Sequence, residues 1–223
     1  MQDKTMLQLG GAAGILGVVF IFAFFFVGPP LPGFCTDPMA QCLQAVADNR
    51  VAALTGGFFG AGSGLLMMVF LVVLYRVARD ADSGIAQVGV TLGLFGFLVI
   101  SLLVGTATIS GTNLASLYSS ASPTDKGAVV TIATAVSGVA PGGLFEIDTV
   151  LRAFGVAALG VSMVKSMNFG KRYGWLTVLV GLIYIPLDFG GLLFDPLFGV
   201  ANTVFFPWLA VVGAKLLSLS RKS

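Results

Sequence analysis

The sequence predicts an all-α fold, a polytopic transmembrane helix bundle of six spans with an additional short exterior helix. Three observations lead to this prediction. Only 10% of the 223 residues are charged and 57% are hydrophobic, whereas soluble domains carry roughly 25% charged residues. The mean hydropathy is +0.98. Apolar runs of the length that crosses a bilayer, about 20 residues, recur along the chain.

The expected spans form one transmembrane domain that covers residues 1–223. We place them near residues 7–28, 51–75, 84–106, 144–165, 173–193 and 197–217. The first apolar run is longer than the roughly 7–15 residues of a signal-peptide core, and no small-x-small cleavage site follows it. We therefore treat it as a span, which Pro29, Pro30 and Pro32 end.

The distribution of cations predicts the orientation. With six spans, both termini lie on one side, and that side holds Lys4, Arg76, Arg79, Lys165, Lys171, Arg172, Lys215, Arg221 and Lys222. The opposite side holds only Arg50 and Lys126, and Arg152 falls within a span. Cytoplasmic loops carry the excess of Lys and Arg. We therefore expect a multi-pass protein of the plasma membrane with both termini in the cytoplasm.

Both cysteines of the chain fall in the first exterior segment. Cys35 and Cys42 lie in "FCTDPMAQC", which would face an oxidising compartment where disulfides form. We expect a disulfide that closes this small loop; the alternative is two free thiols that share a loop. Either role is structural.

The second exterior segment, residues 107–143, begins with small and polar residues. "SPTD" predicts a helix start, with Ser122 as the cap, Pro123 at the first helical position and Asp125 near the positive end of the helix dipole. We expect an exterior helix near residues 123–140 that lies on the bundle or dips into it. Pro141-Gly142-Gly143 would separate it from the fourth span.

Glycines spaced by four residues mark the second and third spans. They are Gly56, Gly60 and Gly64, then Gly89 and Gly93. Small residues at this spacing line one helix face and allow two backbones to approach closely. The partner helix belongs either to this chain or to another one. The stretch "GAGSG" is not a phosphate-binding loop, because it lies inside an apolar helix without the preceding strand or the following Lys-Ser/Thr.

Four charged residues in the exterior half of the spans are the candidate ligand- or ion-binding residues: Glu146, Asp148, Arg152 and Asp188. Arg152 lies eight residues into the fourth span, where a cation requires protein, water or a carboxylate beside it. Asp148 is four residues away, on the same helix face. One interpretation is an outward-facing pocket for a cation, a proton or a polar headgroup. The alternatives are acids that favour a helix start and a buried pair that fixes helix packing.

The composition argues against catalysis. There is no histidine and no cysteine within a span, and no Ser-x-x-Lys arrangement stands in a convincing context. The missing histidine also removes the usual axial ligand of haem and the commonest zinc ligand. Glu146, Asp148 and Asp188 could in principle hold a hard cation, but their spacing does not require it. We expect no cofactor, no metal and no enzymatic activity.

The order of features resembles a widespread prokaryotic family of six-helix membrane proteins catalogued as a domain of unknown function. The resemblance rests on "VLYRVAR" (73–79), "SPTDKGAVVTIATAV" (122–136), "FGKRYGWLTVLVGLIYI" (169–185) and "PWLAVVGAKLL" (207–217). Members often carry a histidine early in the fourth span, where this sequence has Glu146 and Asp148. The resemblance implies the topology and a prokaryotic cytoplasmic membrane, and it supplies no known activity.

These observations favour a non-enzymatic accessory or structural subunit that packs against other membrane helices. The alternative is a carrier or receptor for a small ion or lipid-like ligand, with its polar pocket around Arg152. The expected partners are the lipid bilayer and either other membrane subunits or further copies of the chain, with no nucleic acid.

Overall fold

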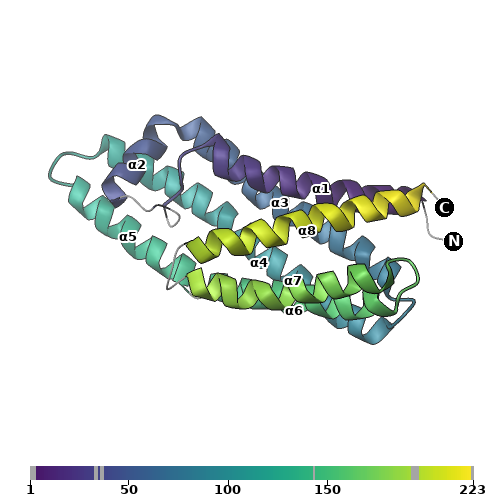
Figure 1. The fold of residues 1–223 in the computed structure, drawn as a ribbon. Helices are drawn as coiled ribbons and strands as arrows, with labels where there is room; N and C mark the ends of the chain where they lie inside the picture. The colour runs from purple at the N-terminus through teal and green to yellow at the C-terminus, as the bar shows by residue number, and fades with distance from the viewer. Residues whose placement is uncertain (1–3, 33–34, 36–37, 143, 192–195, 222–223) are drawn as a thin grey trace. The chain divides into compact units, whose positions relative to one another are not determined.

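The structure is a computed structural model that describes residues 4–32, 35, 38–142, 144–191 and 196–221, without the side chains of residues 138–142, 144–146, 188–191 and 196–203. The described residues fold into eight helices and no strand, which confirms the all-α prediction (Figure 1). The helices are α1 (Lys4–Val27), α2 (Met39–Asp48), α3 (Arg50–Ala78), α4 (Ser83–Ser120), α5 (Lys126–Gly142), α6 (Leu144–Lys165), α7 (Gly170–Gly191) and α8 (Pro196–Ser220).

Four of these helices are long and apolar enough to cross a membrane, as far as the described residues extend: α1, α3, α4 and the Ile147–Lys165 part of α6. They correspond to the first four expected spans. Helices α7 and α8 coincide with the fifth and sixth expected spans. The described apolar part of α8, Val204–Ser220, is shorter than these four. The helices themselves were therefore predictable, and four of them have the length and composition that a membrane crossing requires.

The third expected span was placed too short. Helix α4 does not end near residue 106 but continues to Ser120, for a total of 38 residues. The polar residues after Ser101 do not stop the helix, because their hydroxyls donate to carbonyls one turn back in the same helix: Thr106 to Leu102, Thr108 to Val104, Ser110 to Thr106 and Thr112 to Thr108. At 1.5 Å per residue, α4 is about 57 Å long, well beyond a hydrocarbon core of roughly 30 Å.

The two segments that were expected to be exterior also differ from the expectation. The first contains a ten-residue helix, α2, that the sequence analysis did not predict. In the second, the helix begins at Lys126 and not at Pro123, after a turn in which the Ser122 carbonyl accepts the N–H of Asp125 and of Lys126. The Ser122 hydroxyl donates to the Asp125 carboxylate over 2.5 Å, so it does not act as the expected side-chain cap of the backbone.

The chain forms two compact units, and α1, α3, α4 and α6 contribute residues to both. Unit 2 consists of residues 19–63 and 100–145. Its core is made of Leu31, Leu43, Val46, Ala53, Ala115 and Ala133. Helix α2 packs against α5, and a disulfide joins Cys35 to Cys42 at its start. The predicted disulfide is therefore present.

Unit 1 consists of residues 1–18, 64–99 and 146–223, and it contains all of α7 and α8 and α6 except its first two residues. Helices α1 and α8 run antiparallel, because Gly11 approaches Leu217 while Ile15 approaches Gly213. Helices α6 and α7 form a hairpin in which Gly174 meets Val164. Gly170, at the start of α7, has a φ of +72°, which glycine adopts without strain.

Two further contacts show which helix ends of unit 1 lie together. Arg76, in the last turn of α3, donates to the sulfur of Met6 in the first turn of α1. Lys165, at the end of α6, pairs with Asp82 just before α4. The start of α1, the α3–α4 turn, the α6–α7 turn and the end of α8 therefore lie at one end of unit 1, which we call the basal end.

Candidate functional site

A charged pair lies on α6 inside unit 1. Arg152 donates from Nε to Oδ1 of Asp148 over 2.6 Å and from Nη2 to Oδ2 over 2.5 Å. Asp148 is 0% exposed and Arg152 is 7% exposed. The spacing of one helical turn brings the two side chains together. Two parallel charge-assisted hydrogen bonds are the strongest arrangement available to this pair of groups.

Three aromatic rings surround the guanidinium of Arg152. Its Cζ lies 5.4 Å from the ring centre of Tyr184 on α7, 5.7 Å from Phe97 on α4 and 5.9 Å from Phe205 on α8. Each distance is within the roughly 6 Å at which a cation is attracted to the face of an aromatic ring. We call these three rings the aromatic cage.

Two glycines let α4 approach the pair. A Cβ on Gly96 would lie 2.6 Å from Cγ of Arg152 and 3.1 Å from the carbonyl oxygen of Asp148. One turn further along α6, a Cβ on Gly155 would lie 2.5 Å from the backbone nitrogen of Gly93 and 2.8 Å from the carbonyl oxygen of Gly89. The crossing of α4 and α6 beside the pair therefore depends on glycine in both helices.

Aromatic contacts continue from the cage towards the rest of unit 1. Phe205 and Trp208 lie one turn apart on α8, with their ring centres 5.5 Å apart. The indole N–H of Trp208 donates to the hydroxyl of Thr177 on α7 over 2.9 Å. That hydroxyl donates in turn to the Tyr173 carbonyl. The polar atom of the buried Trp208 is thereby satisfied, and α7 is fixed against α8.

The predicted site residues have different outcomes. The structure brings Asp148 and Arg152 together, whereas the side chains of Glu146 and Asp188 lie outside the described residues. The sequence analysis missed the aromatic cage and the two glycines Gly96 and Gly155, whereas it predicted Gly89 and Gly93, which Gly155 approaches. A signal for the cage existed, because a cation within an apolar helix requires stabilising neighbours, but nothing in the sequence indicated which rings supply them.

Four of the five predicted packing glycines lie against helices of the same unit. A Cβ on Gly60 would lie 2.7 Å from Val104 and 2.8 Å from Phe24, and one on Gly56 would lie 3.7 Å from the Phe24 carbonyl oxygen. Gly64 is buried. Gly89 faces Gly155, and a Cβ on Gly93 would lie 2.6 Å from Leu71. These close approaches are made between helices of this chain.

The arrangement neutralises a charge where water is scarce. The bidentate pair removes the net charge of Arg152 and Asp148, and the rings of the cage cover the guanidinium. Within the part of the chain that the structure describes, no group of three or more His, Cys, Asp or Glu is placed to hold a metal ion. The chemistry that the described residues support at this position is charge compensation within α6, with rings of α4, α7 and α8 packed over the cation.

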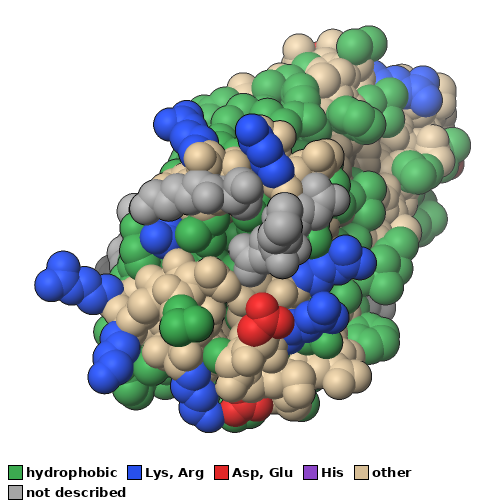
Figure 2. Space-filling model, turned by 90° about the vertical axis from the view of Figure 1, so that its right-hand side faces the viewer, with side chains coloured by type: hydrophobic (Ala, Val, Ile, Leu, Met, Phe, Trp, Pro, Cys, Tyr) green, Lys and Arg blue, Asp and Glu red, His purple; other side chains and the backbone are tan. Residues whose placement is uncertain are grey.

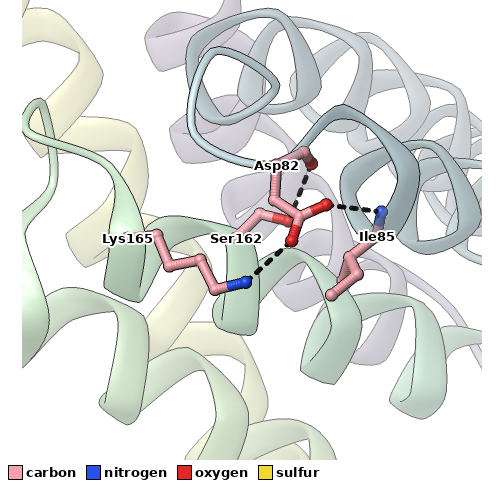
Figure 3. Close-up of polar contacts among 4 residues, drawn as sticks. All are labelled: Asp82, Ile85, Ser162 and Lys165. Carbon is pink, nitrogen blue, oxygen red and sulfur yellow. Dashed lines mark hydrogen bonds and ion pairs between the residues drawn. The ribbon is translucent and has the colours of Figure 1, made fainter.

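A second ion pair lies at the basal end. Lys165 Nζ contacts Asp82 Oδ2 over 2.8 Å, and the other oxygen of the same carboxylate accepts the N–H of Ile85 in the first turn of α4 (Figure 3). The Ser162 hydroxyl lies 3.4 Å from the Asp82 carbonyl. The hydrogen bond from Lys165 lowers the pKa of Asp82 below its ordinary value of 3.8, and the Ile85 N–H acts in the same direction. Asp82 therefore caps α4 and ties it to α6.

The fold and the buried pair define a helical protein with several membrane-type helices, packed around a compensated charge. The chain belongs to the family described as Domain of unknown function (DUF4386), whose model matches residues 10–218. The family resemblance predicted from the sequence is thus confirmed. No curated protein and no solved structure matches the chain.

Proposed function

We propose that the chain is a six-span integral membrane protein that acts without catalysis, as an accessory or structural subunit of a membrane assembly. The observation that carries this proposal is the Asp148–Arg152 pair. The two groups satisfy each other within one helix, and rings from three other helices cover the cation. A buried pair in this setting fixes how helices pack.

The contacts of the basal end support six crossings. Helix α1 starts there, α3 ends there and α4 starts there. Helix α6 then ends at the same place, α7 starts there and α8 ends there. If each of these six helices crosses the bilayer once, the chain crosses six times and both termini lie on one side. The antiparallel contact of Gly11 with Leu217 is what an even number of crossings requires.

The charges support a cytoplasmic basal end. Eight described cations of unit 1 are exposed or half-exposed: Lys4, Arg76, Arg79, Lys165, Lys171, Arg172, Lys215 and Arg221. Lys and Arg side chains gather on the face shown in Figure 2, with few acids among them. An excess of cations marks the cytoplasmic side. The Cys35–Cys42 disulfide of unit 2 fits the opposite, oxidising side of a prokaryotic plasma membrane.

Labelling of single cysteines tests this topology. In a Cys35→Ala/Cys42→Ala background, Asn168→Cys probes the α6–α7 turn and Thr124→Cys probes the turn before α5. A membrane-impermeant maleimide added to intact cells is expected to label the Thr124 variant only. After the cells are opened, both variants are expected to react. Labelling of the Asn168 variant in intact cells contradicts the proposed orientation.

Purification from native membranes tests the subunit role. After extraction in a mild detergent, other membrane proteins or further copies of the chain are expected to remain bound in a fixed ratio, measured by mass photometry and protein mass spectrometry. The matched control is extraction in a harsh detergent that separates subunits. A monomer without partners in the mild detergent contradicts the accessory role.

A carrier or receptor for a small ion or lipid-like ligand is the second candidate. The observation that favours it is a buried Asp–Arg pair within a membrane-type helix, because such residues often mark substrate or proton pathways. The two candidates differ in what replacement of the pair does. A carrier loses ion flux or ligand binding when both residues become apolar, whereas a packing pair can be replaced together without loss.

A further inference from the structure

An apolar groove of about 350 Å³ lies between α1 and α3 in unit 1. It is lined by Met6, Leu9, Met68, Val69, Val72 and Val73, and Arg76 stands at its basal end. Leu9 is 59% exposed, and Val69 and Val72 are each more than a third exposed. The lining therefore faces the surroundings of the helices and not the core of the unit.

The groove follows from the way in which α1 crosses α3. Gly10 and Gly14 of α1 face Val73 and Phe70 of α3, and a Cβ on Gly10 would lie 2.5 Å from Val73. Glycine thus brings the two backbones close together. Leu9 of α1 and Val69 of α3 are exposed parts of the groove lining, whereas Val73 is buried.

Arg76 gives the groove a polarity. It lies in the last turn of α3 and is exposed. Its Nη1 donates to the Met6 sulfur over 3.5 Å, which positions the guanidinium at the mouth of the groove. A thioether is a weak acceptor, and a guanidinium prefers phosphate or carboxylate oxygens in a bidentate arrangement. The groove therefore combines a long apolar wall with an anion-binding end.

We propose that this groove binds one anionic phospholipid, with an acyl chain along the apolar wall and the phosphate on Arg76. Both parts of a phospholipid fit the groove. Its hydrocarbon chain can lie along the apolar wall, parallel to the helices. Its phosphate would meet Arg76 at the basal end, where the other exposed cations also attract anionic headgroups. A free phosphate ion would not use the apolar wall, and a partner helix would not require the cation.

Native mass spectrometry of the full-length protein in a neutral detergent tests the proposal. The delipidated protein is titrated with phosphatidylglycerol or phosphatidylcholine that carry the same acyl chains. One phosphatidylglycerol is expected to bind about fivefold more tightly than phosphatidylcholine, as one cation near the membrane surface allows. Glycerol phosphate, which has the charge without the chains, is expected not to compete. Equal binding of the two lipids, or displacement by glycerol phosphate, overturns the proposal.

Matched variants locate the site. Arg76→Gln is expected to abolish the preference, whereas Arg79→Gln, an exposed cation three residues further on and outside the groove lining, is expected to retain it. Equal effects of the two substitutions overturn the assignment to the groove.

Val72→Trp fills the groove from an exposed position. It is expected to weaken the binding of both lipids without a change in the melting temperature of the protein. Unchanged lipid binding in this variant would place the lipid on another surface and would also overturn the proposal.

Discussion

Gly155 of α6 faces Gly93 of α4 so closely that a Cβ on Gly155 would lie 2.5 Å from the Gly93 backbone nitrogen. The same position would lie 2.8 Å from the Gly89 carbonyl oxygen. Both neighbours are backbone atoms, which cannot turn aside as a flexible side chain can. The contact lies one turn from Arg152, so the spacing between α4 and α6 also determines how Phe97 meets the guanidinium.

Gly155→Ala is therefore expected to destabilise the protein by about 1–3 kcal/mol, the usual result of overpacking a close contact. Thermal unfolding in detergent measures the effect. Gly105→Ala is the matched control, because Gly105 is also in a helix and a Cβ there meets nothing within 4 Å among the described atoms. The control is expected to be neutral or slightly stabilising, since alanine favours the helix over glycine. Similar losses in both variants would contradict the role given to the Gly155 contact.

Reduction of the Cys35–Cys42 disulfide is expected to destabilise unit 2. The bridge closes a short loop, with a sequence separation of 7, and loop-closure entropy for such a loop corresponds to about 2 kcal/mol. Limited proteolysis with and without reductant measures the exposure of α2, whose Leu43 and Val46 belong to the unit 2 core. A Cys35→Ala/Cys42→Ala variant controls for other actions of the reductant and should not respond to it. Unchanged protection of α2 after reduction would rule out this role.

The Asp82–Lys165 pair is expected to make stability depend on pH in the acid range. The pKa of Asp82 is lowered in the folded state, so its ionised form is favoured by folding. The contribution is present above the ordinary pKa of 3.8 and is lost as the pH falls through the lower folded value. Wild type is thus expected to melt above Asp82→Asn at pH 6, and this difference should shrink as the pH falls below the ordinary pKa of 3.8.

Asp80→Asn is the matched control for this comparison, because Asp80 is an exposed acid in the same turn. It is expected to show a smaller difference from wild type at pH 6. A wild-type advantage over Asp82→Asn that is the same above and below this ordinary pKa would show that the asparagine acts through capping geometry and not through the loss of charge.

The helical segments could be predicted because composition and helix-breaking residues determine them locally. Helix α6 begins and ends at the residues expected for the fourth span. The length of α4 could not be read in this way. Its Thr and Ser residues look like a loop in a hydropathy profile, but they bond to carbonyls within the helix, and its last turns pack into the unit 2 core through Leu114, Ala115 and Tyr118. Tertiary packing extended this helix beyond its apolar part.

Only the part of the candidate site formed by residues close together in the sequence could be predicted. The four-residue spacing of Asp148 and Arg152 places them on one helix face. The aromatic cage depends on residues that are far apart in the sequence, Phe97, Tyr184 and Phe205, and no periodicity connects them. Likewise, the glycine spacing indicated close packing, but only the structure identifies Gly155 and Leu71 as partners of Gly89 and Gly93.

The most direct test of the structural role is a substitution cycle at the buried pair, with unfolding measured in mixed micelles. Asp148→Leu and Arg152→Met are each expected to lower the free energy of unfolding by about 3 kcal/mol or more, because each leaves a buried charge without its counterion. The double variant is expected to regain most of this stability and to keep its bound partners. The exposed Asp82–Lys165 pair is the control and should show little coupling. A double variant that is as unstable as the single variants, or that is stable but has lost ligand binding or ion flux, would contradict the account.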